Sequence, residues 1–179
     1  MTFFSKQTSN FLIKKETVLL SLSLFCAGFV FVSLLLIAVF VYNHAETNVP
    51  IALKNQLSSL NFWAILAQNT GVAIALLSGS FFVKVPTVLL LLANGAGLGF
   101  VLTANMYTTG QWLYFIALIS VHGIIELTAL MIAGNIGFQK IDWSKKTEIK
   151  KLINTIILII FLLIIAAAME TYVTPLFWR

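Results

Sequence analysis

Residues Leu118 to Phe138 read LISVHGIIELTALMIAGNIGF. This segment is long enough to cross a bilayer, whose hydrocarbon core needs about 20 mostly apolar helical residues. His122 and Glu126 nevertheless stand in its middle, four residues apart and therefore on one face of a helix. Ionisable side chains are costly inside a bilayer and by default mark functional positions. The segment therefore predicts a membrane span that carries a polar site.

The composition places the whole chain in a membrane. Its 179 residues are 60% hydrophobic and only 9% charged, and the mean hydropathy is +0.99. A soluble domain needs far more polar surface to cover its core. The single cysteine, Cys26, excludes an intrachain disulfide and a cysteine metal cluster. The net charge of +5 comes from lysines between apolar segments, a pattern typical of loops at anionic lipid headgroups, so no nucleic-acid partner is expected.

Five segments are long and apolar enough to span the bilayer. They cover about residues 18–41, 60–83, 85–104, 111–138 and 152–173. We therefore expect an all-α fold, a polytopic bundle of about five transmembrane helices that forms one domain over residues 18–175 after an N-terminal segment, 1–17. Between the second and third spans, Lys84 and Pro86 predict a tight turn, because proline cannot continue a helix at its own nitrogen. The first apolar run is about twice as long as the core of a signal peptide, so we expect a retained span.

Basic residues predict the orientation of the bundle. Of the eleven Lys and Arg residues, three lie in segment 1–17, one is Lys84 and five lie between residues 139 and 151. The opposite side would hold only Lys54 and Arg179. The positive-inside rule then puts the N-terminus and loop 139–151 in the cytoplasm and the C-terminus outside the cell membrane. Lipid is the expected partner of that loop, and a cytoplasmic protein is an alternative partner.

Polar side chains from four spans fall within one slab of the bilayer. At about 1.5 Å per helical residue, His122, Glu126 and Asn94 lie near the midplane. Asn69 lies in the outer half, and Glu170 lies near the outer end. We expect the His122–Glu126 pair to face Asn94 and Asn69, whose amides can donate and accept hydrogen bonds. The alternative is that these groups only join the helices, at about 0.6 to 2 kcal/mol per bond.

Small residues predict close contacts between helices. Gly95 and Gly99 form a small-xxx-small face in the third span, and Gly123 and Gly134 lie in the fourth. This spacing favours a compact bundle and permits a homodimer through such a face. The first span has neither a small-residue cluster nor a central charge, so it is expected to be peripheral and lipid-facing.

Several catalytic and metal-binding patterns are absent from the sequence. His-Gly-x-x-Glu is not the His-Glu-x-x-His motif of zinc peptidases, no serine stands in a Gly-x-Ser-x-Gly context, and there is no phosphate-binding loop. His122, Glu126 and Glu170 are candidate metal ligands, but three candidates on two helices give thin support. We therefore expect no metal, no cofactor and no enzymatic activity. An intramembrane hydrolase that uses His122 and Glu126 is an alternative, and so is a bundle that carries protons or a substrate.

Four motifs occur along the chain in a fixed order: AQNTGVAIALLSG, LLANGAGLGFVL, HGIIELTALMIAGNIGF and AAAMETYVTP. The series resembles the stage II sporulation protein M family of multispanning membrane proteins, over about residues 60–175. The residues that match its motifs are Asn69, Asn94, Gly95, His122, Gly123, Glu126, Leu127, Ala129, Glu170, Thr174 and Pro175. The chain departs from the family at Gln68, where an asparagine is usual, and at Val121 and Thr128, where prolines are usual. These departures indicate a divergent branch and put in doubt a helix break beside His122.

The resemblance implies two settings for the protein. Sporulating members of the family act in a membrane complex with cell-wall hydrolases and resemble scaffolds, and no enzymatic activity is established for the family. Other members are found beside genes for circular antimicrobial peptides and are linked to secretion or self-protection. The leading expectation is thus a non-enzymatic subunit or scaffold of a membrane complex, with wall hydrolases or an ABC transporter as partners. The alternative is an accessory for secretion of, or immunity to, a cationic bacteriocin-type peptide, which Glu126 and Glu170 would contact.

Overall fold

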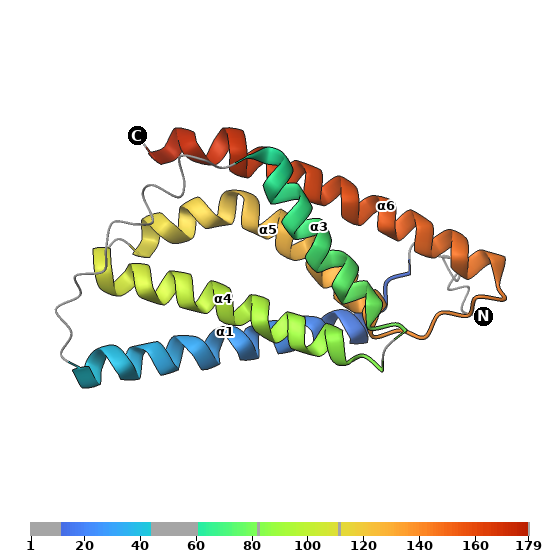
Figure 1. Ribbon diagram of the computed structural model, residues 1–179, viewed down its shortest axis with the longest axis horizontal. Coiled ribbons are helices and arrows are strands. Elements are labelled where there is room, and N and C mark those ends of the chain that lie inside the picture. Colours follow the sequence, from blue (N-terminus) through green and yellow to red (C-terminus); the bar gives the residue numbers. More distant parts are fainter. Residues whose placement is uncertain (1–11, 44–60, 82, 111, 179) are drawn as a thin grey trace, which may run out of the picture.

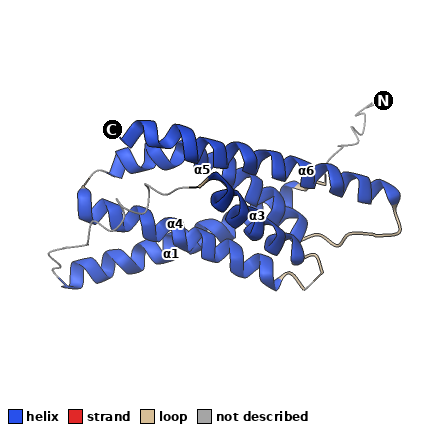
Figure 2. Cartoon of the chain, turned by 45° about the horizontal axis from the view of Figure 1, so that its top comes forward, coloured by secondary structure: helices blue, strands red, loops and turns tan. Residues whose placement is uncertain are grey.

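The computed structural model describes residues 12–43, 61–81, 83–110 and 112–178. Within these ranges the chain is a bundle of five α-helices without strands (Figures 1 and 2). The helices are α1 (Lys15–Asn43), α3 (Phe62–Ser78), α4 (Val85–Thr109), α5 (Trp112–Gly137) and α6 (Lys146–Ala168), and α6 continues into a π-helix, η2 (Met169–Val173), and a 3₁₀-helix, η3 (Thr174–Trp178). By length and composition α1, α4, α5 and α6 could each cross a membrane. The predicted class, an all-α polytopic bundle, is confirmed.

The helix α3 is shorter than the span expected at residues 60–83. Its 17 residues cover about 26 Å, less than the hydrocarbon core of about 30 Å. Asn61 caps its first turn, because the Asn61 side chain accepts a 3.0 Å hydrogen bond from the Trp63 N–H. The helix ends at Ser78, and the chain then turns back toward α4.

The turn between α3 and α4 is tight, as Lys84 and Pro86 predicted. The Lys84 N–H donates to the Gly79 carbonyl at 3.0 Å, and Val83 and Lys84 adopt positive φ angles of 47° and 65°. A positive φ is strained for a β-branched residue such as Val83. Pro86 stands in the first turn of α4, where a missing N–H costs nothing.

Close backbone contact joins α1 to α4, and this is the most extensive contact between two helices of the bundle. A Cβ added to Gly28 would collide with the backbone of Leu92, and one added to Gly95 would collide with the backbone of Phe25. Gly99 likewise faces the backbone of α1. The Gly95–Gly99 face is therefore occupied within the chain. Although α1 exposes most of its side chains, as expected for a peripheral span, it is held firmly to α4.

The buried core is concentrated in the half of the bundle where α3 and α5 end and α4 and α6 begin. From residue 129 to residue 139, α5 and its end are almost continuously buried, whereas residues 119–128 are half-buried or exposed. The fully buried apolar side chains of this half include Leu76, Leu91, Ala129, Ala133, Ile136, Ile159 and Leu163. One half of the molecule is thus well packed and the other half is looser.

Asn135 ties the N-terminal end of α1 to the packed half. Its side chain is fully buried; the side-chain oxygen accepts from the Lys14 N–H at 3.1 Å and from the Thr17 hydroxyl. The Asn135 amide donates to the Leu12 carbonyl at 2.9 Å. The sequence offered no reason to single out this residue, because a polar residue near a helix end usually faces water.

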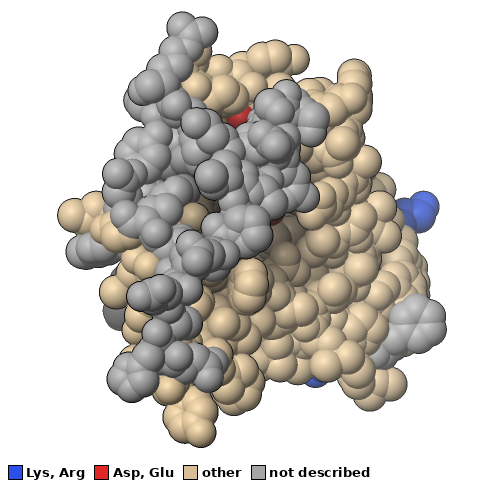
Figure 3. Space-filling model, turned by 60° about the vertical axis from the view of Figure 1, so that its left-hand side comes forward, with Lys and Arg blue, Asp and Glu red and all other residues tan. Residues whose placement is uncertain are grey.

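The segments that carry the described lysines meet at this same end, on the right of Figure 1. These lysines belong to the start of α1, the α3–α4 turn and the α5–α6 connection: Lys14, Lys15, Lys84, Lys140, Lys145, Lys146, Lys150 and Lys151. In the connection, Asp142 pairs with Lys145 at 3.0 Å, and hydrogen bonds from Ser144 and then Lys145 lower the pKa of Asp142 to about 2. Among the residues that the structure describes, Figure 3, which turns the opposite end forward, shows lysine only at the edge of the face and a few acidic atoms near its top. The orientation of the bundle stays a prediction, which this distribution supports.

Candidate functional site

Three ionisable side chains converge in the looser half of the bundle. His122 and Glu126 come from α5, one turn apart, and Glu170 comes from η2 at the end of α6. One ring nitrogen of His122 and one carboxylate oxygen from each glutamate all lie within 4.8 Å of one another, and all three residues are half-buried. We call these three residues the His–Glu–Glu cluster.

A change of helix type places Glu170 in the cluster. Pro175 has no N–H to donate, and its ring would collide with a carbonyl one turn earlier, so the α-helix cannot continue through it. The chain widens into the π-helix η2, in which the Thr174 N–H donates to the Met169 carbonyl five residues before it. π-Helical turns are rare and occur frequently at functional sites.

His122 is oriented by a second residue of the same segment. Its Nδ1 lies 3.1 Å from the hydroxyl of Thr174, which is buried. That hydroxyl lies 3.2 Å from the Met169 carbonyl, to which it donates its proton. With that bond in place, Nδ1–H donates to the hydroxyl, and this tautomer of the neutral ring keeps its lone pair on Nε2. Nε2 is thus the atom available to accept a proton or to ligate a metal.

Within the described ranges, no lysine or arginine forms an ion pair with either glutamate. Both ion pairs found there involve Lys145, in the α5–α6 connection. Two carboxylates this close together in apolar surroundings repel each other unless a proton or another cation lies between them. The cluster therefore favours a positively charged occupant.

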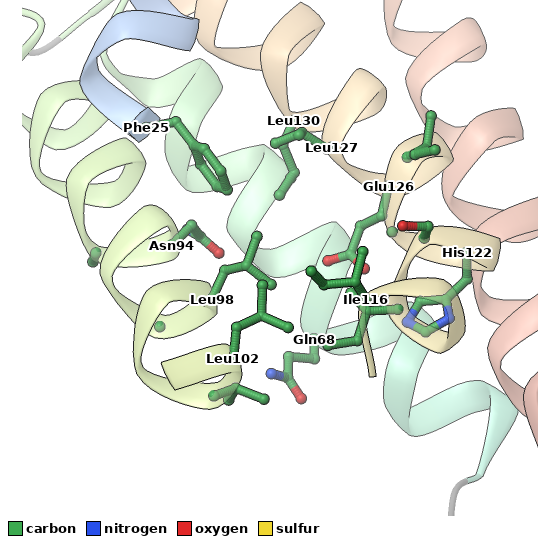
Figure 4. Close-up of a pocket in the computed structure, with 17 residues that line it drawn as sticks. Phe25, Gln68, Asn94, Leu98, Leu102, Ile116, His122, Glu126, Leu127 and Leu130 are labelled. Carbon is green, nitrogen blue, oxygen red and sulfur yellow. The ribbon is translucent and has the colours of Figure 1, made fainter. Parts of the chain in front are cut away.

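A cavity of about 590 Å³ adjoins the cluster (Figure 4). Its walls come mainly from α4 and α5, with Phe25 of α1 and Gln68 of α3, and His122 and Glu126 form part of them. Most of the lining is apolar, and the volume lies within the range of about 300–1,000 Å³ that is usual for small-ligand pockets. The lining residue Ile124 is 65% exposed, so this rim residue also belongs to the outer surface of the bundle.

The expected asparagine face is only partly present at the cavity. Asn94 lines it together with His122 and Glu126, but the Asn94 amide donates to the Leu90 carbonyl of its own helix at 2.8 Å. Asn69 is buried on α3 outside the lining, and its neighbour Gln68 lines the cavity instead. Sequence position alone could not decide this, because consecutive residues of a helix point about 100° apart.

The other predicted residues fall into distinct places. Gly123 lines the cavity, and Gly134 packs against Ser21 of α1 and Leu91 of α4. Pro175 is exposed. The helix α5 runs unbroken through Val121 and Thr128, where the family usually has prolines. No helix break therefore flanks His122 in this chain.

Comparison with known proteins agrees with these motifs. The family model described as Stage II sporulation protein M matches residues 19–175. An uncharacterized protein of Methanocaldococcus jannaschii is 31% identical over 176 residues, which cover 90% of this chain and 95% of that protein. No solved structure matches the chain. The match covers nearly all of α1, the whole of α3 to η2 and the His–Glu–Glu cluster, and the chain therefore belongs to the stage II sporulation protein M family.

Proposed function

We propose that this protein is a non-enzymatic subunit or scaffold of a membrane complex, and that a membrane segment of a partner protein occupies the cavity between α4 and α5. The single observation that carries the proposal is that three apolar residues of the cavity lining, Val101, Ile116 and Ile124, are exposed on helices α4 and α5, which are long and apolar enough to cross a membrane. A partner helix could insert an apolar side chain there and contact Asn94 and Gln68 with a polar group. The described connections at residues 79–81, 83–84 and 138–145 are short and offer a partner little surface.

A photo-crosslinker at the rim of the cavity tests this proposal. The residue p-benzoylphenylalanine would replace Ile124 at the rim or, as a matched control, Phe31, which is 69% exposed on α1 and lies outside the cavity lining. In native membranes we expect position 124 to give a discrete adduct with one other membrane protein, and position 31 to give none. Equal adduct patterns at both positions, with a chain that migrates alone in mild detergent, would contradict the proposal.

A second candidate function is handling of a cationic amphipathic peptide, in secretion or in immunity. The observation that favours it is the pair of carboxylates, Glu126 and Glu170, which have no lysine or arginine partner within the described helices and lie beside the cavity. Under this function, expression of the chain would protect a sensitive strain against such a peptide. Protection should disappear in Glu126→Gln and Glu170→Gln but persist in Glu16→Gln, which removes a carboxylate at the other end of the bundle. A strain with unchanged sensitivity would exclude this function.

A further inference from the structure

We infer that His122, Glu126 and Glu170 bind a divalent transition-metal ion. Their three ligand atoms lie within 4.8 Å of one another. Ligands of one zinc ion, each at about 2.0–2.2 Å from it, lie roughly 3 to 3.6 Å apart. Small side-chain rotations would therefore bring all three atoms onto a single ion. This inference replaces the expectation of no metal, which rested on not knowing that the π-helix brings Glu170 to α5.

The ligand types indicate which ions the site would hold. Mg²⁺ and Ca²⁺ prefer sites made only of oxygen, whereas one imidazole with two carboxylates suits Zn²⁺, Mn²⁺ or Fe²⁺. A divalent ion with two carboxylates and a neutral imidazole has no net charge. Neutrality removes the cost of holding Glu126 and Glu170 together in apolar surroundings.

The surroundings of His122 match those of a metal ligand. Ligating histidines nearly always donate their second ring N–H to an oxygen, which fixes the tautomer and the orientation of the ring. Thr174 provides that oxygen, since its hydroxyl lies 3.1 Å from Nδ1 and its own proton is directed to Met169. The free Nε2 would then be the metal ligand.

The site would keep at least one coordination position open. Three protein ligands with water or a bound molecule in the remaining position are typical of sites that bind a further ligand, whereas sites closed by four protein ligands are structural. His122 and Glu126 also line the 590 Å³ cavity, so a carboxylate or carbonyl group of the partner segment that is proposed to occupy it could reach the ion. The cavity and the metal would then form one binding site.

Metal titration of the purified full-length chain tests the inference. The protein in detergent would be stripped with EDTA and titrated with Zn²⁺ by calorimetry, and with Co²⁺ by visible absorption. We expect one ion per chain and a Co²⁺ spectrum of four- or five-fold coordination. His122→Gln, Glu126→Gln and Glu170→Gln should each weaken binding at least tenfold. The matched controls are Glu16→Gln and His44→Gln, which remove a carboxylate and the chain's other histidine and should bind as the wild type does.

Two results would overturn the inference. One is a Co²⁺ spectrum of the wild type identical to that of the aqueous ion, a measurement that does not depend on any variant. The other is equal affinity in the wild type and in variants whose helical circular dichroism and elution volume are unchanged, which would indicate adventitious binding at the surface. If Glu126→Gln or Glu170→Gln aggregates, the corresponding aspartate variant is used in its place. Aspartate keeps the charge, but its side chain is shorter. These aspartate variants should also lose at least tenfold in affinity.

Discussion

At the residue scale, the hydrogen bond between His122 and Thr174 decides what the imidazole can do. It leaves Nε2 as the atom with a lone pair and holds the ring toward the two glutamates. The i and i+4 spacing of His122 and Glu126 was sufficient to predict their proximity. The approach of Glu170 and Thr174 was not predictable, because it depends on how α6 crosses α5 and on a π-helix that only the folded chain reveals.

Replacing the Thr174 hydroxyl should weaken metal binding without disturbing the fold. Thr174→Val keeps the shape of the side chain but leaves Nδ1–H without its acceptor, so we expect Zn²⁺ affinity to fall about 10- to 100-fold. Thr128→Val is the matched control, because Thr128 is exposed on α5 and its hydroxyl bonds only to the Ile124 carbonyl of its own helix. Equal Zn²⁺ affinities for the two variants in calorimetry would show that Thr174 does not orient the ligand.

Removing the buried amide of Asn135 should destabilise the packed half of the bundle. Asn135→Leu leaves the Lys14 N–H without its acceptor and leaves the Leu12 carbonyl with only the 3.4 Å bond from the Gln139 amide, and we expect a loss of about 2–4 kcal/mol in the free energy of unfolding. Asn94→Leu, whose amide bonds only within its own helix, should cost about 1 kcal/mol or less. Unfolding in a mixed detergent series measures both variants. A loss in Asn94→Leu as large as in Asn135→Leu would contradict this assignment.

At the element scale, glycines set the distance between α1 and α4. Gly95→Ala would push a methyl group into the backbone of Phe25, and we expect a loss of about 1–3 kcal/mol or a shifted α1. Gly97, two residues on, has no atom within 4 Å of an added Cβ, so Gly97→Ala should be neutral or stabilise α4 by up to about 1 kcal/mol. Thermal unfolding in detergent compares the pair. Equal melting temperatures would mean that α1 does not pack closely on α4 in solution.

Sequence patterns located the helices but not their pairing. Hydropathy and Pro86 placed the spans and the turn before α4, because both signals are local. The expectation that the first span is merely peripheral was incomplete, since Gly28 makes the close approach to Leu92 and a lone glycine is a weak signal. The ends of α3 and α6 also differ from the expected spans. A turn with positive φ angles ends α3, and Pro175 ends the last helix. The hydropathy of the sequence does not predict either feature.

At the scale of the whole molecule, charge is distributed along one axis. The described lysines lie at the packed end, and the His–Glu–Glu cluster and the cavity lie in the looser half. Composition predicted a polytopic bundle, and lysine counts predicted its orientation. Neither could predict that packing is concentrated in one half, because burial arises from contacts between helices distant in sequence.

Cysteine labelling in whole cells tests the predicted orientation. In a Cys26→Ser background, a membrane-impermeant maleimide should label Ser144→Cys, in the exposed α5–α6 connection, only after lysis. It should label Lys54→Cys in intact cells, because the loop of residue 54 is predicted to lie outside; that residue falls beyond the described ranges. Labelling of Ser144→Cys in intact cells would show that the bundle has the opposite orientation.

The decisive question is whether the His–Glu–Glu cluster is a functional centre or only joins the helices. Glu126→Gln is nearly isosteric and removes one carboxylate, so it should be introduced at the native locus. Membrane abundance and rescue of the deletion phenotype should then be measured in the same cells. We expect near-normal abundance with loss of rescue. Collapsed abundance would show that the carboxylate serves assembly, and full rescue would show that its charge is dispensable; either result would contradict a functional centre at Glu126.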